Sequence, residues 1–181
     1  MSVRYAIADE AERLWLIRNE AIRSGCQEVY DNETIMAFTP DTMPEGYRHA
    51  IINNPFFVID DAILSLPVAT GFLDITNNSV EAIFTLPNYQ NKGLATKILE
   101  AIKSEARTRG ITALTLSSTP NAVVFYQANG FSIDKHGEYY SGSAKRYLPC
   151  VEMSLDMGLY TPNNSSCRKA AREGVPMSLL R

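Results

Sequence analysis

The sequence predicts an α+β fold, in which helices and strands combine in one domain. The central observation is the stretch from Ser79 to Arg109, which reads as a strand, a short polar loop and a long helix. An alternating strand and a short helix follow it, and short β-prone runs bounded by turn signals lie on both sides. The 181 residues leave room for one domain with its own hydrophobic core.

The N-terminal part predicts a short strand followed by a helix. The strand is Val3–Ile7, and Asp9 can cap a helix that runs to about Arg23 and ends at Gly25. The apolar face of this helix is formed by Leu14, Trp15, Ile17 and Ala21. Its three arginines are interpreted as a solvated face: Arg13, Arg18 and Arg23.

A broken helical region comes next. Asn32 or Asp31 could cap a helix over Glu33–Phe38, which Pro40 stops, and a second helix is predicted over Pro44–Asn53. The region contributes the side chains of Tyr30, Phe38, Met43, Tyr47 and His49.

The remaining strands come from β-prone runs between turn signals. They are predicted over Phe56–Asp60, over Val68–Thr76 with a possible bulge at Gly71, from Phe131 to about Tyr140, and near Val151–Asp156. Residues 1–156 are therefore taken as the domain. Residues 157–181 are rich in Asn, Ser, Arg and Pro and form a C-terminal extension of unknown role, for which disorder and packing on another subunit are equally open.

The loop Gln90–Gly93 leads directly into the central helix. Apolar residues recur at helical spacing from Leu94 to Ala106, and Gly110 stands where a helix C-cap is expected. The first N–H groups of a helix have no internal partner and carry a partial positive charge, so this junction can bind an anion. On its own, a loop with one glycine is a weak signal and is more often an ordinary connection between a strand and a helix.

Two motifs in order resemble the GCN5-related N-acetyltransferase (GNAT) superfamily. The first is Gln/Arg-x-x-Gly-x-Gly/Ala, matched by Gln90-Asn91-Lys92-Gly93-Leu94-Ala95. The second is an Asn followed by Phe-Tyr and Gly-Phe, matched by Asn121, Phe125-Tyr126 and Gly130-Phe131. One departure is Asn91, where many relatives have Gly; Asn tolerates unusual backbone angles better than most residues. The resemblance is sharpest over Ser79–Phe131 and extends over Val3–Asp156.

The resemblance implies a mixed, mostly antiparallel central sheet flanked by helices and splayed at the central strands, where acetyl-CoA binds as co-substrate. The broken helical region would cover the acceptor cleft. The phosphates would lie against the amides of Asn91 to Thr96, the pantetheine alongside Phe84 to Leu86, and Asn121 would bond the pantetheine. The binding residues it implies are Phe84, Thr85, Leu86, Gln90, Asn91, Lys92, Gly93, Leu94, Ala95, Thr96, Asn121 and Tyr126.

Catalysis is assigned to two side chains. Tyr126 would protonate the departing thiolate, because a phenol has a pKa of about 10. Glu81 would deprotonate the acceptor amine through water, with Asp74 as another candidate, although a solvated or ion-paired carboxylate is an equal reading of Glu81. Alternation places Glu81 and Phe84 on opposite faces unless a bulge intervenes. No cysteine lies near the motifs in the sequence, which argues for direct transfer over an acetyl-cysteine intermediate.

Composition limits the partners. The net charge of −3 gives no sign of a nucleic acid or anionic membrane, and no apolar run approaches the length of a membrane span. Three cysteines without metal spacing indicate a reducing compartment, and the cytoplasm is expected. The sequence thus predicts an N-acetyltransferase for a primary amine of a small molecule or peptide, a monomer or homodimer without a metal. The alternatives are a non-catalytic CoA-binding regulatory module and an interaction domain that shares only the topology.

Overall fold

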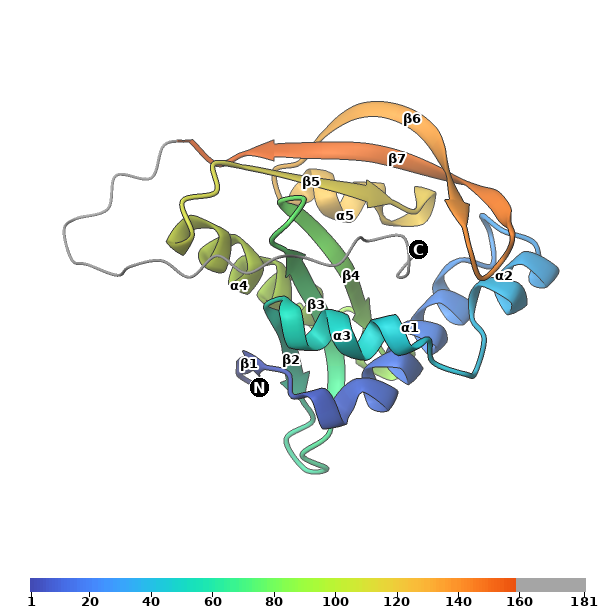
Figure 1. The fold of residues 1–181 in the computed structure, drawn as a ribbon, viewed down its shortest axis with the longest axis horizontal. Helices are drawn as coiled ribbons and strands as arrows, with labels where there is room; N and C mark the ends of the chain where they lie inside the picture. Colours follow the sequence, from blue (N-terminus) through green and yellow to red (C-terminus); the bar gives the residue numbers. More distant parts are fainter. Residues whose placement is uncertain (159–181) are drawn as a thin grey trace.

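A computed structural model of the chain describes residues 1–158. Most of the predicted C-terminal extension therefore lies outside the described residues. Within residues 1–158, the strands form one seven-stranded sheet in the order β1-β2-β3-β4-β5-β7-β6 (Figure 1). Their bounds are β1 Val3–Tyr5, β2 Phe56–Asp60, β3 Pro67–Asp74, β4 Ser79–Thr85, β5 Ala113–Ser118, β6 Ser132–Ser141 and β7 Arg146–Asp156.

The sheet is mixed. Strands β1 to β4 pair antiparallel, β4 and β5 pair parallel, and β5, β7 and β6 pair antiparallel. The parallel pair needs a crossover, and the helix after β4 supplies it. The predicted α+β fold with a mixed, mostly antiparallel sheet is confirmed.

Five α-helices of the described part flank the sheet: α1 Ala11–Gly25, α2 Asn32–Phe38, α3 Glu45–Asn53, α4 Leu94–Thr108 and α5 Val123–Ala128. Of the two predicted caps for α2, Asp31 is the one used: its Oδ1 accepts from the Thr34 N–H at 2.7 Å. The predicted cap at Asp9 is wrong, because Asp9 lies in a 3₁₀ turn, Ala8–Glu10, and α1 follows it.

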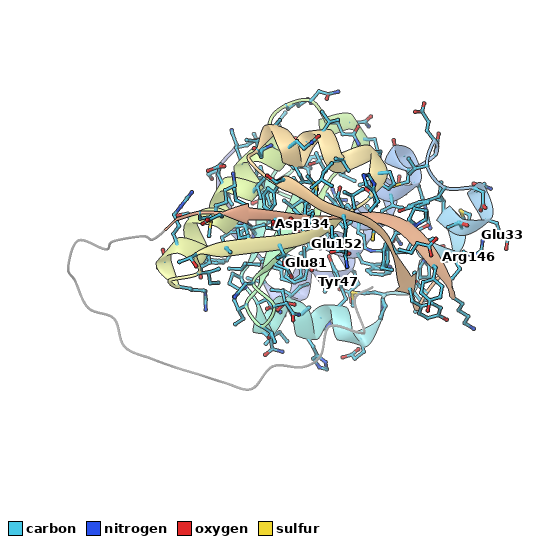
Figure 2. All side chains as sticks on the ribbon, turned by 90° about the horizontal axis from the view of Figure 1, so that it is seen from above. Glu33, Tyr47, Glu81, Asp134, Arg146 and Glu152 are labelled. Carbon is cyan, nitrogen blue, oxygen red and sulfur yellow. The ribbon has the colours of Figure 1, made fainter. Side chains whose placement is uncertain are left out.

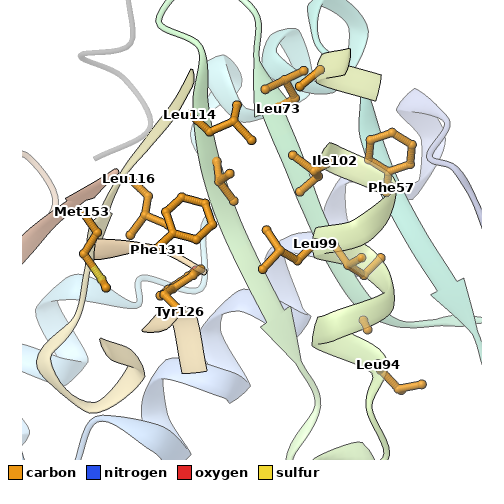
Figure 3. Close-up of a cluster of buried hydrophobic side chains, with 14 of the residues drawn as sticks. Phe57, Leu73, Leu94, Leu99, Ile102, Leu114, Leu116, Tyr126, Phe131 and Met153 are labelled. Atoms are coloured by element: carbon orange, nitrogen blue, oxygen red, sulfur yellow. The ribbon is translucent and has the colours of Figure 1, made fainter. Parts of the chain in front are cut away.

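Two hydrophobic clusters hold the layers together. Figure 3 shows the first, in which α4 and α5 pack on one face of the sheet through Leu99, Ile102 and Tyr126. The second lies on the opposite face, where α1 and α3 pack on β2 and β3 through residues such as Leu14, Tyr47 and Phe72. At full burial a large apolar side chain contributes about 1.5–3 kcal/mol, so these two clusters set the positions of α1 and α4.

The β6–β7 hairpin reaches across to α2. Tyr30 donates to the Pro149 carbonyl at 2.8 Å, and the rings of Phe38 and Tyr139 lie 6.1 Å apart. At the outer end of the hairpin Arg146 pairs with Glu33 at 2.8 Å (Figure 2). These contacts hold the hairpin against α2 and the segment that precedes it.

The arginines of α1 do not form the solvated face expected from the sequence. Arg18 is buried, with 5% of its surface exposed, while Arg13 and Arg23 are half-buried. Arg13 donates to the Pro67 carbonyl at 2.8 Å, and Arg23 donates to the Thr39 carbonyl at 2.7 Å. The reason is tertiary: α1 is covered by α2 and by the segment that precedes α3.

Candidate active site

Strands β4 and β5 separate almost as soon as they meet. Their pairing is limited to Ser79 with Thr115, and beyond it β5 runs away from β4 (Figure 1). The edge of β4 that faces β5 therefore has no strand partner over most of its length. This is the splay that the family resemblance implied.

A bulge in β4 changes which side chains share a face. Phe84 pairs with Thr70, and Glu81 pairs with Phe72, so Gly71 is opposed by two residues, Ala82 and Ile83. Ala82 has a φ of 54°, which is the left-handed region. Because the extra residue shifts the alternation, Glu81 and Phe84 project on the same face.

The loop before α4 exposes its backbone. Asn91 and Gly93 have φ values of 59° and 72°, both in the left-handed region. Asn91 thus adopts an unusual backbone conformation of the kind that asparagine tolerates better than most residues. The N-cap is Gly93, and no side chain caps the helix. The first N–H groups of α4 are therefore left for solvent or a ligand, at the positive end of the helix dipole.

A cavity of about 510 Å³ joins this loop to the open edge of β4. Its floor is formed by Ile83, Phe84 and Thr85, and α5 contributes Phe125. The end of α1, which the sequence had not placed in the site, also lines the cavity. Its lining residues there are Ala21, Ile22, Gly25 and Cys26.

The cavity brings most of the predicted binding residues together. Those that line it are Phe84, Thr85, Gln90, Asn91, Gly93, Leu94, Ala95, Thr96 and Asn121. Leu86 and Lys92 do not line it. Lys92 instead donates to the Asn88 carbonyl at 3.1 Å and stacks on the ring of Tyr89, which does line the cavity.

The two predicted catalytic residues lie beside the cavity rather than in its lining. Tyr126 is 9% exposed and packs edge-on against Phe125 and Phe131, at centroid distances of 5.0 and 5.8 Å. Phe125, the neighbouring ring on α5, lines the cavity and also packs against the core. Burial and then the negative charge of Glu81 raise the pKa of the Tyr126 phenol. Glu81 accepts a hydrogen bond from Ser79 Oγ at 2.9 Å.

The carboxylate of Asp74, the other candidate base, is occupied by hydrogen bonds within a turn. Asp74 is buried, and its carboxylate accepts from the N–H groups of Thr76 and Asn77 and from the Asn77 amide. His49 is exposed on α3. Among the carboxylates considered from the sequence, Glu81 is thus the one close enough to Tyr126 to affect its pKa.

A cysteine does lie near the motifs in space, contrary to the expectation from the sequence. Cys26 follows α1, lines the cavity, and its thiol donates to Asn121 Oδ1 at 3.7 Å. Burial raises the pKa of this thiol to about 11. A thiol with such a pKa is protonated at neutral pH and is a poor nucleophile.

These features define a ligand site of the acyltransferase type, with a helix N-terminus at one end and an open strand edge beside it. The sequence matches a family model described as "Acetyltransferase (GNAT) domain" over residues 26–155, more than half of the chain. The chain belongs to the GNAT acetyltransferase family. No curated protein was found that matches it.

Solved structures agree on the fold. A GCN5-related N-acetyltransferase from Rhodopseudomonas palustris superposes with a TM-score of 0.76 at 17% identity, over 86% of this chain and 94% of that one. The PaiA N-acetyltransferase from Thermoplasma acidophilum, in complex with coenzyme A, gives 0.67 at 19% identity over 86% and 98%. YncA from Salmonella typhimurium, with acetyl-CoA, gives 0.63 at 17% identity over 92% and 99%.

Within residues 1–158 no helix is long and apolar enough to cross a membrane.

Proposed function

We propose that this protein transfers the acetyl group of acetyl-CoA to a primary amine, by direct attack of the amine on the thioester in a ternary complex. The observation that carries the proposal is the continuous cavity between the uncapped start of α4 and the open edge of β4. Membership of the GNAT family and the coenzyme complexes of two similar structures support it.

The residues present suit the coenzyme. The amides of Asn91 to Thr96 would hold the phosphates, because they combine unpaired N–H groups with the helix dipole. The edge of β4 at Phe84 and Thr85 would hold the pantetheine through main-chain hydrogen bonds. Thr85 Oγ1 also lies buried without a hydrogen-bond partner in the described residues, so a polar ligand in the cavity would satisfy it.

Three groups would carry the chemistry. An amide near Thr85 would stabilise the developing oxyanion, worth on the order of 3 kcal/mol. Tyr126 would protonate the departing thiolate. Glu81 would accept a proton from the amine through water, which matters because only about one lysine-like amine in a thousand is neutral at pH 7.

Direct transfer is favoured by the state of Cys26. An acetyl-cysteine intermediate needs a thiolate, and burial keeps this thiol protonated. We therefore expect Cys26→Ala to keep turnover within about threefold of the wild type, since it removes a weak hydrogen bond to Asn121 and one buried sulfur atom but no nucleophile. Trapping of an acetylated Cys26 by mass spectrometry, together with an inactive Cys26→Ala, would contradict direct transfer.

The function is tested by incubating the protein with acetyl-CoA and a panel of primary amines. Release of free thiol and the mass of the acetylated amine are followed together. Acetylation of at least one amine above the uncatalysed rate supports an enzyme. Tight acetyl-CoA binding with no product from any amine would favour the non-catalytic module, and absence of coenzyme binding would favour the interaction domain.

A further inference from the structure

Arg18 is a buried cation without an anion. Its Cζ lies 4.5 Å from the centroid of the Trp15 ring and 4.6 Å from that of Phe38, so its charge is held between two aromatic faces. Within residues 1–158 it has no ion pair with a carboxylate; the salt bridges of that part involve other cations. Buried charges are normally paired, so this position calls for a partner.

The hydrogen bonds of Arg18 leave one edge of the guanidinium available. Nη1 donates to Asn19 Oδ1 at 2.8 Å and to the Phe38 carbonyl at 3.0 Å, which uses both of its N–H groups. Nε and Nη2 have no hydrogen bond to any residue of the described part. Together these two nitrogens form the side of the fork that binds a carboxylate through two parallel bonds.

A second unpaired donor lies close by. Tyr47 is 2% exposed, and its Oη is enclosed without a hydrogen-bond partner in the described residues. The Tyr47 ring packs edge-on against Trp15 at 5.2 Å, and Trp15 is the ring on which Arg18 stacks. The charge of Arg18 also acts on the Tyr47 phenol, lowering a pKa that burial raises more strongly. Arg18 and Tyr47 therefore both contact the ring of Trp15.

This pair adjoins the proposed coenzyme site. Phe38, which contacts the Arg18 cation, also lines the 510 Å³ cavity. Phe84 of β4 lines the same cavity and packs against both the cluster that contains Tyr47 and the one that contains Phe38. Arg18 and Tyr47 are not among the residues that line the cavity, but Phe38 and Phe84 connect it to them. An acceptor whose amine met the thioester along β4 would reach Arg18 past these two rings.

We propose that the acceptor amine also carries a carboxylate, and that the Nε–Nη2 edge of Arg18 binds it with Tyr47 Oη as a further donor. The substrate class is then a small amino acid, or a peptide whose C-terminal carboxylate lies close to its amine. This inference rests on the proposed acetyl transfer and adds the recognition of the acceptor. The carboxylate of the substrate would then offset the positive charge of Arg18, which is buried between the rings of Trp15 and Phe38.

The test compares matched acceptors in the full chain. L-amino acids are assayed beside their C-terminal amides, which keep the side chain and the amine but lose the negative charge. Because amidation also lowers the pKa of the amine, the rates are compared per concentration of neutral amine. We expect the wild type to prefer the acid of the best pair by at least about tenfold in kcat/KM, because a site built for a charged group rejects the neutral analogue. Equal rates for acid and amide would overturn the proposal.

Variants separate recognition from structure. Arg18→Gln should lower kcat/KM for the acid by at least about 30-fold and change that for the amide by less than about threefold, since only the acid uses the fork. Arg13→Gln, on the same helix, is the matched control and should leave the acid-to-amide ratio unchanged. An Arg18→Gln protein that loses activity equally on both acceptors would show a purely structural role.

Two further measurements test the proposal if Arg18→Gln does not fold or if no amine is acetylated. If Arg18→Gln does not fold, Tyr47→Phe replaces it, because it removes a hydroxyl that has no partner to lose in the described residues. The acid preference should fall by about tenfold, the effect of one hydrogen bond to a charged group. An unchanged acid preference would overturn the assignment of Tyr47 as a donor.

If no amine is acetylated, the acetyl transfer fails, and calorimetric titration of the same amino acids and amides decides the carboxylate site. Binding of acids alone, abolished in Arg18→Gln or weakened in Tyr47→Phe, would support it; equal binding of acids and amides would overturn it.

Discussion

At Tyr126, burial and the charge of Glu81 act in the same direction. Both raise the pKa of the phenol above its ordinary value near 10, so its proton is retained at neutral and mildly alkaline pH. A general acid is effective only in its protonated form, and the environment of Tyr126 favours that form. The same burial means that the ring also supports the cluster around Phe131, so catalysis and packing have to be separated by experiment.

Tyr126→Phe separates them, because it keeps the ring and removes only the proton. We expect turnover to fall on the order of 10²-fold, the low end for general acid catalysis, with a much smaller change in KM for acetyl-CoA. Steady-state kinetics with both substrates varied provides the measurement. Tyr5→Phe, which removes an exposed hydroxyl bonded to Glu105, is the control and should keep full activity. Unchanged turnover in Tyr126→Phe would leave this residue a packing residue.

The pH profile gives an independent test of the same residue. Because the folded pKa of Tyr126 is raised, the phenol stays protonated past the point where a free tyrosine would ionise. Rates should therefore rise as the amine loses its proton, without a descending limb assignable to Tyr126 below about pH 10. A fall in kcat/KM centred clearly below that pH, absent in Tyr126→Phe, would contradict this assignment of its environment.

Arg18 and Cys26 show what sequence reasoning missed at this scale. Residues 14, 17, 18 and 21 follow the i, i+3, i+4, i+7 spacing of a buried helix face, so Arg18 occupies a core position that the periodicity could have revealed. Because Arg18 is charged, it was interpreted instead as part of a solvated face. Cys26 offered no such signal, since its place in the cavity depends on where the end of α1 lies relative to Asn121.

At the scale of elements, the strand–loop–helix unit was predictable because its local signals agree. The turn at Pro87, the glycine before the helix and the apolar spacing from Leu94 onward all indicate the same arrangement. The bulge in β4 was considered from the sequence only as an event that would change the alternation of Glu81 and Phe84. Its left-handed residue is Ala82, and alanine has no intrinsic preference for that conformation, so tertiary packing around Gly71 must impose it. A Cβ at Gly71 would lie 2.7 Å from Ile98 of α4, which shows how closely the helix covers this point.

The phosphate loop is tested by Gly93→Val, with Gly110→Val as the matched control. Both glycines flank α4, have φ values of 72° and 75°, and have open space where a Cβ would stand. The two variants therefore share the backbone strain, but Gly93 alone of the two lines the cavity. We expect Gly93→Val to weaken acetyl-CoA binding by at least about tenfold (about 1.4 kcal/mol), measured by calorimetry, and Gly110→Val to leave it unchanged. Equal affinities in two folded variants would exclude this loop as the phosphate site.

For the molecule as a whole, the order of the strands could not be derived from local patterns. Periodicity locates a strand and its faces, but it does not say that β7 inserts between β5 and β6. The side of the site that α1 and α2 form could not be derived from local patterns either. These helices are far from the motifs in the sequence, and long-range packing brings them to the cavity. The family resemblance supplied this arrangement in outline, and Phe38, Cys26 and Arg18 were placed by the structure.

The C-terminal limit of the domain gives the last prediction. After β7 the Met157 N–H donates to the Thr112 carbonyl at 2.8 Å, and its side chain packs against the cluster beneath α4. A chain that ends at Gly158 keeps both contacts and every proposed binding residue, so we expect its acetyl-CoA affinity to stay within about twofold of the full chain. A chain that ends at Asp156 is the comparison: it loses both contacts and should be less stable by about 1–2 kcal/mol in urea unfolding, with the affinity of the folded fraction retained. Loss of acetyl-CoA binding in the chain ending at Gly158 would mean that residues 159–181 complete the coenzyme site.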